Sequence, residues 1–295
     1  MVYNSHLKIM KKLFAKICAA ALAVVACVTC FTGCNNKTIK VMKDIALTAE
    51  EYAFAIKKDN TDLLNSVNAC IAEWKEDGSL DALINSYFDG TATFTYENKT
   101  ATPADGDFIM ATNAYFPPFE YKEGDKFKGV DVELAYKLAT ALDKNLFVYD
   151  MDFGAIINSV KTGESDIGMA GMTVTETRLL KVNFATPYYE SAQVISVLAT
   201  DKTFDDCETA ADVEAILATK GKDYKIGTQK ATTGYMYSNG DEDFGYDGFP
   251  NLTTSAYTTG ALAMKDLQNG KVNAVILDLQ PSLMIANSIN DSNNE

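Results

Sequence analysis

Apolar and polar positions alternate along the chain with two different periods, and together they predict an α/β protein. The segments FIMAT (108–112) and LFVYDMD (146–152) have the apolar character of buried strands. Between them, VDVELAYKLATAL (130–142) places apolar residues at helical spacing. Further along, FGAIINSVKTG predicts a helix that ends at Gly163, DIGMAG a strand, and TETRLLKV a short helix. Such alternation is typical of a largely parallel sheet covered by helices.

The pattern resumes after YYESAQVISVLAT (188–200) and predicts a second lobe with its own core. ADVEAILAT and TTGALAMKDLQNG have helical periodicity, whereas YKIGT and VNAVILD read as strands. A weak internal repeat supports this division, because VKTGESDIGMAG and LQNGKVNAVILD align Gly171 with Asp278. Ligands of open α/β sheets bind beyond the carboxyl ends of the strands. We therefore expect TVTETR of one lobe and Asp278 of the other on opposite walls of a cleft.

Residues 10–34, MKKLFAKICAAALAVVACVTCFTGC, have the features of a secretion signal: lysines, an apolar stretch, and small residues before a cysteine. FTGC resembles the lipobox of bacterial lipoproteins, which makes Cys34 the expected lipidated residue; VVAC, ending at Cys27, is a rival box. An uncleaved membrane anchor is the alternative to a cleaved signal. We assign residues 1–33 to the signal peptide and expect the rest of the chain on the extracytoplasmic face of the cell membrane.

Charge and composition narrow the classes of function. The net charge is −14, which argues against nucleic acid and anionic lipid surfaces as partners. The single histidine, His6, lies in the leader, so the rest of the chain has no histidine for a catalytic triad or a metal site. We expect no metal, no cofactor and a monomer. Cys70 and Cys207 read as structural thiols, with a disulfide as the alternative.

Arg178 is the only arginine of the chain, and every other basic side chain apart from His6 is a lysine. Two explanations are open. Lysine-favouring codon usage leaves one arginine by chance in a surface ion pair, or this position needs a planar, permanently charged fork that grips a carboxylate with two parallel hydrogen bonds.

A zwitterionic ligand would fit the residues expected around the cleft. Its carboxylate would bind Arg178, the Thr173 hydroxyl and the free amides at the start of the TETRLLKV helix. Its ammonium group would bind Asp278. Thr173 and Asp278 each have an alternative role as a helix cap.

Two loops complete the expected site. MATNAYFPPFEY (110–121) predicts a stiff loop that presents Phe116 at the carboxyl end of a strand, and Phe153 opens the helix after the next strand; packing in the core is the alternative for both aromatics. GTQKATTG (227–234) predicts a strand-to-helix turn whose backbone amides, including those of Thr233 and Gly234, close over the ligand. This turn lacks the pattern of a nucleotide phosphate loop.

The segments AYFPPFEY, FKGVDVELAYKLA, MDFGAIINSV, DIGMAGMTVTETRLLKVNFATPYY, KIGTQKATTG and VNAVILD resemble, in that order, the extracellular solute-binding proteins of polar amino-acid ABC importers. The resemblance covers nearly all of residues 107–289 and implies a two-lobed, periplasmic-binding-protein-like (type II) fold with a ligand cleft between the lobes. It implies that Arg178 binds the α-carboxylate of an amino acid, aided by Thr173 and Gly171. Contacts with the α-ammonium group, the side chain or the backbone face of the ligand are implied for Asp278, Phe116, Phe153 and Gly234.

The chain departs from the family at its two ends. Family members continue after the VNAVILD strand with a return hinge strand and two helices, whereas this sequence stops soon after that strand, at SNNE. Residues 47–88 are similar to the missing part, and their apolar stripes predict two helices. We interpret the chain as circularly permuted; a partial duplication is the alternative. The expected organisation is residues 34–50 as part of lobe 2, 51–188 as lobe 1 with a polar linker at 89–107, and 189–295 as a hinge strand and lobe 2.

These inferences predict a lipid-anchored binding protein that closes its lobes on an amino acid and delivers it to an ABC transporter permease. The alternatives are a dehydratase-like enzyme of the same fold, with Glu120 or Asp278 as acid or base, and a sensory or orphan amino-acid-binding lipoprotein. Family members that bind cationic amino acids often carry an aspartate at the position of Asn113. The absence of this aspartate argues against lysine or arginine as the ligand, unless Glu120 takes its role. Glutamine and cystine remain open.

Overall fold

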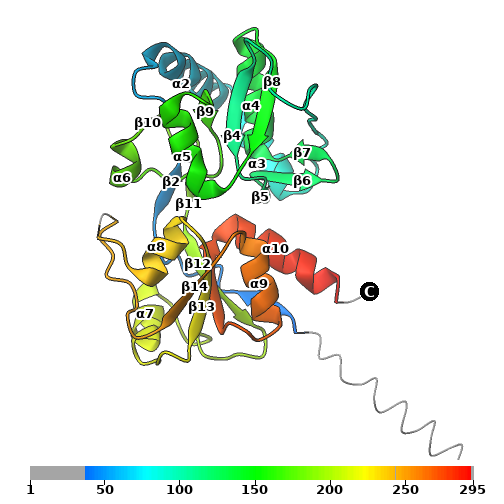
Figure 1. The fold of residues 1–295 in the computed structure, drawn as a ribbon. Coiled ribbons are helices and arrows are strands. Elements are labelled where there is room, and N and C mark those ends of the chain that lie inside the picture. The colour runs from blue at the N-terminus through cyan, green and yellow to red at the C-terminus, as the bar shows by residue number, and fades with distance from the viewer. Residues whose placement is uncertain (1–36, 243, 294–295) are drawn as a thin grey trace, which may run out of the picture. The chain divides into compact units, whose positions relative to one another are not determined.

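The computed structural model describes residues 37–242 and 244–293. The expected signal peptide and Cys34 lie outside the described residues. The described strands form two five-stranded sheets, a two-stranded crossing pair and a three-stranded sheet, and helices pack on the two larger sheets (Figure 1). The predicted α/β fold is confirmed.

The larger sheet of lobe 1 has the strand order β10-β3-β9-β4-β8. Strand β4 (Phe108–Thr112) has the bounds that FIMAT predicts, and it runs parallel to β8 (Leu146–Asp150) and β9 (Ile167–Gly168). The antiparallel strands β3 (Ala55–Ile56) and β10 (Asn183–Phe184) complete the sheet. The parallel strands β4 and β9 point their carboxyl ends toward the same edge.

The helices of lobe 1 follow the apolar stripes of the sequence. They are α2 (Thr61–Glu76), α3 (Ser79–Phe88), α4 (Val130–Ala141), α5 (Phe153–Thr162) and α6 (Glu176–Leu179). Helix α5 ends at Gly163, whose φ of 80° lies in the left-handed region that favours glycine, as predicted. Helix α3 buries its apolar stripe and packs against α4, so the segment before residue 89 contributes to this lobe.

The sheet of lobe 2 has the strand order β1-β12-β15-β13-β14. Its strands are β1 (Ile39–Val41), β12 (Gln193–Leu198), β13 (Lys225–Gln229), β14 (Thr253–Tyr257) and β15 (Ala274–Asp278). Strands β13, β14 and β15 are parallel, whereas β12 is antiparallel to both of its neighbours, β1 and β15.

Four helices belong to lobe 2: α7 (Ala210–Ala218), α8 (Thr233–Asn239), α9 (Gly260–Gln268) and α10 (Leu279–Asp291). The first three each begin after a threonine whose hydroxyl accepts a backbone N–H of the first turn, namely Thr209, Thr232 and Thr259. Helix α10 follows β15 directly and starts beside Asp278.

Two short antiparallel strands cross between the sheets, β2 (Glu50–Tyr52) and β11 (Tyr189–Ser191) (Figure 1). Strand β2 lies within EEYAFAI (50–56) and strand β11 within YYESAQVIS (188–196). Side chains alternate along β2, so Glu50 and Tyr52 are buried whereas Glu51 is exposed. This alternation places one glutamate of the pair toward the interior of the molecule.

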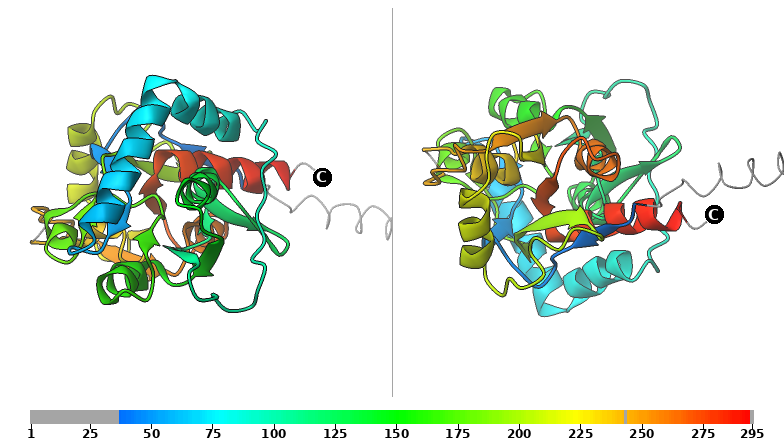
Figure 2. Two further views of the ribbon diagram at one scale, coloured as in Figure 1. Left: turned by 90° about the horizontal axis from the view of Figure 1, so that it is seen from above. Right: turned by 90° about the horizontal axis from the view of Figure 1, so that it is seen from below.

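Residues 39–88 contribute to both lobes. Strand β1 pairs with β12 in lobe 2, with Ile39 opposite Leu198, whereas β3, α2 and α3 belong to lobe 1. The Asn290 side chain of α10 accepts the N–H of Ile39 at 2.8 Å and donates to its carbonyl oxygen at 2.9 Å. The first strand and the last helix of the described chain therefore lie side by side (Figure 2).

The structure contains several elements that the sequence analysis did not predict, among them helix α10 and strand β10. The segment around Pro117 and Pro118 is not an irregular loop but part of a meander of β5 (Tyr115–Phe116), β6 (Glu120–Glu123) and β7 (Lys126–Lys128). Strand β14 was not predicted, because its sequence TTSAY is mostly polar and only half-buried. Among the described residues, no helix is long and apolar enough to cross a membrane.

Candidate functional site

A small cavity lies where residues of both lobes meet. Its volume is about 10 Å³, enough for roughly one water molecule. Eight of the nine predicted ligand-binding residues line it: Asn113, Phe116, Phe153, Gly171, Thr173, Arg178, Thr233 and Asp278. The ninth, Gly234, follows Thr233 in helix α8 but does not line the cavity. Four further residues complete the wall: Glu120, Ala170, Gln229 and Thr232.

The topology of the two sheets brings these residues together. In lobe 1, Asn113 follows the last residue of β4, and Gly171 and Thr173 lie just beyond β9. In lobe 2, Gln229 and Asp278 are the last residues of β13 and β15. All five positions are at the carboxyl ends of parallel strands, where open α/β sheets bind their ligands.

The guanidinium group of Arg178 spans the two lobes. Nη1 donates to the carbonyl oxygen of Thr173 at 2.7 Å, and Nη2 donates to that of Ala231 at 3.2 Å. Its central carbon lies 5.3 Å from the centre of the Phe153 ring, a cation–π distance. Arg178 is only 7% exposed, which rules out a surface ion pair as the reason for the arginine.

Burial lowers the pKa of Arg178 to about 10, and the negative charges of Glu50 and Asp278 oppose this change. The guanidinium therefore stays protonated at neutral pH. Arg178 is held by helix α6, whose N-cap is Thr175: its hydroxyl accepts the Arg178 N–H at 3.3 Å. Thr173, for which capping was the alternative role, does not cap this helix.

Asp278 is a buried carboxylate on the lobe 2 side. Its Oδ1 accepts the Tyr52 hydroxyl at 2.5 Å, and its side chain makes no capping hydrogen bond to α10. Burial, and next the negative charge of Glu50, raise the pKa of Asp278 to about 7; hydrogen bonds from Tyr52 and Gln193 act in the opposite direction. A cationic group beside Asp278 would favour its charged form.

Glu120 forms part of the wall on the lobe 1 side. The sequence analysis named it as a substitute for an aspartate at residue 113 and as the acid or base of a dehydratase-like enzyme. It is fully buried, and neither carboxylate oxygen accepts a hydrogen bond from an N–H or O–H group within the described chain. Burial, and next the negative charge of Asp131, raise the pKa of Glu120 well above its usual value. The side chain that interacts with the Glu120 carboxyl group is that of Asp131, which is itself a carboxyl group, so no cationic partner balances it. A carboxyl group in the wall of a cavity without a cationic partner is a candidate site for a ligand donor.

Asp131 contacts two residues that line the cavity, Gly171 and Glu120. Its Oδ1 accepts the Tyr188 hydroxyl at 2.6 Å, and its Oδ2 accepts the N–H of Gly171 at 3.0 Å. Burial raises the pKa of Asp131 to about 6. Because two buried carboxylates repel one another, a hydrogen bond between Asp131 and Glu120 requires that one of them hold a proton.

Glu50 is a residue that the sequence analysis missed. It is 6% exposed, and its Oε2 accepts the hydroxyl of Thr173 at 2.6 Å and that of Thr233 at 2.8 Å. Its Oε1 accepts the hydroxyl of Thr48 at 2.7 Å. The signal that would have found it is the period of two along EEYAFAI, which puts Glu50 on the same face as Tyr52.

Close packing accounts for the glycines that were predicted in the site. Gly171 has φ of +53°, and a Cβ atom there would lie 2.7 Å from the Phe116 ring. A Cβ atom at Gly234 would lie 2.5 Å from Oε1 of Gln193. Asn113 is engaged by both lobes, since it donates to the carbonyl oxygen of Met151 at 2.8 Å and accepts from Gln229 at 3.1 Å.

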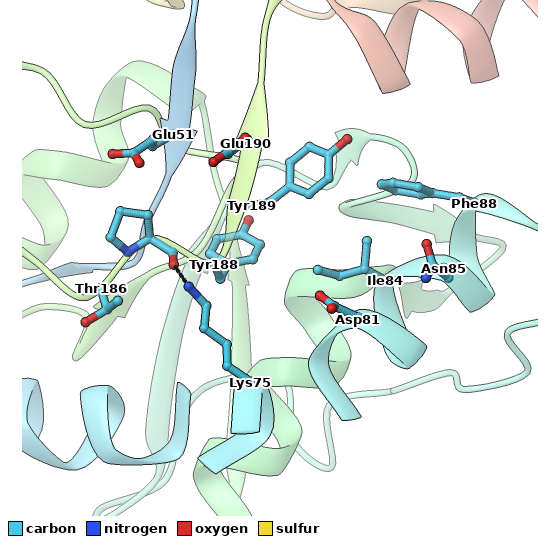
Figure 3. A pocket seen from close by; sticks show the side chains of 11 residues that line it. Glu51, Lys75, Asp81, Ile84, Asn85, Phe88, Thr186, Tyr188, Tyr189 and Glu190 are labelled. Atoms are coloured by element: carbon cyan, nitrogen blue, oxygen red, sulfur yellow. Dashed lines mark hydrogen bonds between the residues drawn. The ribbon is translucent and has the colours of Figure 1, made fainter. Parts of the chain in front are cut away.

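A larger, open groove of about 630 Å³ lies elsewhere, between α2, α3 and the crossing strands (Figure 3). Glu51, Asp81, Phe88 and Tyr189 are among its lining residues, and Lys75 donates to the carbonyl oxygen of Pro187 at its edge. It shares no residue with the central cavity and contains none of the predicted site residues. We therefore take the small cavity as the candidate site.

No cluster of three or more histidine, cysteine, aspartate or glutamate side chains in the described part of the chain has the arrangement of a metal site. Cys70 and Cys207 are free, half-buried thiols and do not form the disulfide that was the alternative.

Residues 108–275 match the model of the bacterial extracellular solute-binding proteins, family 3. The arginine-binding extracellular protein ArtP of Bacillus subtilis (strain 168) is 44% identical over 87 residues, which are 30% of this chain and 34% of ArtP. The putative ABC transporter arginine-binding protein 2 of Escherichia coli (strain K12) is 32% identical over 170 residues, 57% of this chain and 62% of that protein. The chain thus spans between about a third and two thirds of these relatives.

Solved structures show the same fold. The ancestral amino acid-binding protein AncCDT-1, described as a precursor of cyclohexadienyl dehydratase, has a TM-score of 0.53 and 27% identity, covering 62% of this chain and 74% of that one. An ancestral arginine-binding protein bound to arginine has a TM-score of 0.51 and 28% identity at the same coverage. The fold, the placing of the site at the strand ends and the match over residues 108–275 agree: the chain belongs to the bacterial extracellular solute-binding proteins, family 3.

Proposed function

We propose that the protein captures an amino acid with a cationic side chain in the central cavity and delivers it to an ABC importer. The observation that carries this proposal is the arrangement of charge in one cavity: Arg178 is its single cationic side chain, and Asp278 and Glu120 are its carboxyl groups. Arg178 would bind the α-carboxylate, Asp278 the α-ammonium group, and Glu120 the side-chain cation. Each ligand charge then has a partner of opposite sign.

Glu120 decides between cationic and neutral ligands in this proposal. Asn113 had argued against lysine or arginine, but Asn113 is already engaged by Met151 and Gln229. The carboxyl group of Glu120 interacts with the carboxyl group of Asp131 and has no amide or cationic partner, and a buried carboxylate is stabilised by an opposite charge. Two relatives, ArtP and the putative arginine-binding protein 2, are named for binding arginine, which supports an arginine-like ligand.

The ligand would enter by separation of the lobes. An amino acid is much larger than a cavity of about 10 Å³, so the contacts between Arg178 and Ala231 and between Asn113 and Gln229 have to open first. A ligand that touches both walls then favours the closed form. The closed form is what a permease would recognise, and no catalytic step is needed.

We also propose that Cys34 carries a lipid that anchors the protein to the extracytoplasmic face of the membrane. The support is the FTGC sequence after an apolar, lysine-led segment. Growth of cells that express the protein with a radiolabelled fatty acid should label the wild-type chain and not Cys34→Ser. Label retained in Cys34→Ser and lost in Cys27→Ser would move the anchor to the rival box.

We further propose that the chain is a circular permutation of the family fold. Residues 39–88 contribute one strand to lobe 2, a crossing strand, and a strand and two helices to lobe 1, and the family match begins only at residue 108. The hydrogen bonds between Asn290 and Ile39 support it, because they hold the two proposed new ends together.

The proposed ligand class is tested by a thermal-shift screen of the full chain in detergent against the common L-amino acids and ornithine. Ligands that bind only the folded state raise the melting temperature. Arginine, lysine or ornithine should give the largest shift. Arg178→Ala should abolish it, and Arg178→Lys should weaken binding by roughly 10- to 100-fold, because an ammonium group cannot form the two parallel hydrogen bonds.

Lys181→Ala is the matched control, since Lys181 is an exposed cation three residues after Arg178 and should bind as the wild type does. A shift with neutral amino acids alone would remove Glu120 from the proposal. No shift with any amino acid, even after unfolding, dialysis and refolding to remove a bound ligand, would refute the amino-acid site itself.

A further inference from the structure

Three hydroxyl groups converge on the buried carboxylate of Glu50. Thr173 of lobe 1 and Thr233 of lobe 2 both donate to Oε2, and Thr48 donates to Oε1. Glu50 lies on β2, so it is fixed to the crossing strands rather than to either lobe. It contacts the two threonines that line the cavity without itself lining it.

Each hydroxyl group has one hydrogen and two lone pairs, and an ionised carboxylate only accepts. When Thr173 and Thr233 donate to Glu50, neither has a hydrogen left to offer to the cavity. Thr233 also accepts from Nε2 of Gln193 at 3.1 Å, which leaves it one lone pair. Both threonines can therefore present only acceptors to a ligand.

Thr173 and Thr233 line the same small cavity as Asp278. The side chain of Gln193 links Thr233 to Asp278: its Nε2 donates to the Thr233 hydroxyl, and a hydrogen bond from the same side chain lowers the pKa of Asp278. Tyr52, two residues after Glu50 on the same face of β2, donates to Asp278. This part of the wall thus offers the Thr173 and Thr233 oxygens together with a carboxylate, a set of acceptors that matches the three N–H groups of an ammonium ion.

We propose that Glu50 is a positioning residue that makes the site specific for the α-ammonium group of its ligand: by accepting the hydroxyl hydrogens of Thr173 and Thr233, it turns both oxygens into acceptors beside Asp278. The inference rests on the proposed amino-acid function. It replaces the sequence expectation that the Thr173 hydroxyl donates to the ligand carboxylate. That carboxylate then depends on Arg178 and on backbone N–H groups.

The test compares two ligands that differ only in the α-amino group, L-arginine and 5-guanidinopentanoate, by isothermal titration calorimetry on the full chain. In Glu50→Gln only one of the two terminal side-chain atoms can accept a hydrogen bond. Where the NH2 group takes the place of Oε2, it cannot accept from Thr173 or Thr233, and their hydroxyl hydrogens turn away from residue 50. The preference for arginine over its des-amino analogue should fall at least tenfold. Glu51→Gln, which removes the same charge from the next, exposed residue, should keep the wild-type preference.

A double-mutant cycle separates this role from a general effect of charge. If Glu50 acts through the hydroxyls, Glu50→Gln should change the ligand preference little in a Thr173→Val, Thr233→Val background. A full effect of Glu50→Gln in that background would overturn the inference. An equal loss of affinity for both ligands in Thr173→Val would also overturn it, because a hydroxyl that donates to the carboxylate serves both equally.

Thr173→Val and Thr233→Val, each measured alone, keep the inference testable if Glu50→Gln does not fold; both should lose affinity for arginine more than for the analogue. The outcomes also separate the two proposals. Wild-type protein that binds neither ligand refutes the amino-acid function and this inference with it. Wild-type protein that binds arginine, with an unchanged preference in Glu50→Gln, refutes only the role of Glu50.

Discussion

Four buried carboxyl groups, those of Glu50, Glu120, Asp131 and Asp278, lie near the one buried guanidinium. The carboxyl groups outnumber the cation, and burial of unpaired charge is costly. Two features reduce this cost. Hydroxyl groups of threonine and tyrosine donate hydrogen bonds to Glu50 and Asp278. The raised pKa of Glu120 keeps its carboxyl group protonated, and so neutral, up to a higher pH. A ligand with an additional positive charge would relieve the imbalance.

Asp278 should make stability depend on pH. Its pKa of about 7 lies above the value of about 3.9 for an unfolded aspartate, so between these values the folded state holds a proton that the unfolded state has lost. Its contribution is therefore fully present below about pH 4 and is lost as the pH rises toward 7. Asp278→Asn lacks this loss, and it should gain stability relative to the wild type by at most about 1.4 kcal/mol per pH unit in this window.

Urea unfolding of both proteins without ligand, from pH 4.5 to 7.5, measures this difference. Asp266→Asn serves as a control, because a hydrogen bond from Lys271 lowers the pKa of Asp266 and keeps it ionised throughout the window. Its stability difference from the wild type should not change with pH. A difference for Asp278→Asn that is constant or of opposite slope would contradict the raised pKa.

The residues of the site were predictable to different degrees. Arg178 stood out because it is the only arginine, and Asp278 because it ends a buried strand. Glu50 did not, since EEYAFAI contains two adjacent glutamates and only the alternation of β2 shows which of them is buried. The buried environment of Glu120, in which another carboxyl group, that of Asp131, raises its pKa, depends on packing from several elements, which no local pattern records.

At the scale of elements, the strongly periodic segments were predicted well. FIMAT has the exact bounds of β4, and the FGAIINSVKTG helix ends at Gly163, because apolar runs and left-handed glycines are local signals. The meander β5–β7 was missed, since two prolines suggested a loop, although β5 and β6 flank them in an antiparallel pair. Strand β14 was missed because it is a half-buried edge strand whose mostly polar sequence contains no apolar run.

The pairing of α10 with β1 supplies the test of the permutation. A variant whose residues 293 and 37 are joined by about eight Gly and Ser residues, and whose new ends lie between Pro103 and Ala104, should fold. Residues 101–106 are exposed, and Asn290 already holds Ile39, so few contacts are lost. We expect stability within about 2 kcal/mol of the original chain and ligand affinity within roughly threefold.

The matched control has the same joint but opens the chain between Met110 and Ala111. These residues lie inside β4, which pairs with both β8 and β9, so this variant should not fold. Circular dichroism and the thermal shift with ligand measure both variants. Loss of folding in the Pro103–Ala104 variant, with a linker of any length, would contradict the proposed permutation.

For the whole molecule, the fold class followed from the sequence, whereas the contacts across the cavity did not. Alternation and the repeat around Gly171 and Asp278 indicate two sheets, but the hydrogen bonds from Arg178 to Ala231 and from Gln229 to Asn113 join residues far apart in sequence. Such contacts depend on how the lobes close. Periodicity reports on one segment at a time, whereas the approach of the two lobes depends on how all the segments pack together.

The strand order has a consequence for synthesis. Strand β1 leaves the ribosome early, yet among the described strands it pairs only with β12, where Ile39 lies opposite Leu198. The strands of the lobe 1 sheet, from β3 to β10, all lie between them in the chain. At about 5–20 residues per second, β1 waits roughly 8–30 s for β12. Lobe 1 can therefore assemble first, as an uninterrupted stretch, while the opening strand of lobe 2 stays unpaired until its partner emerges.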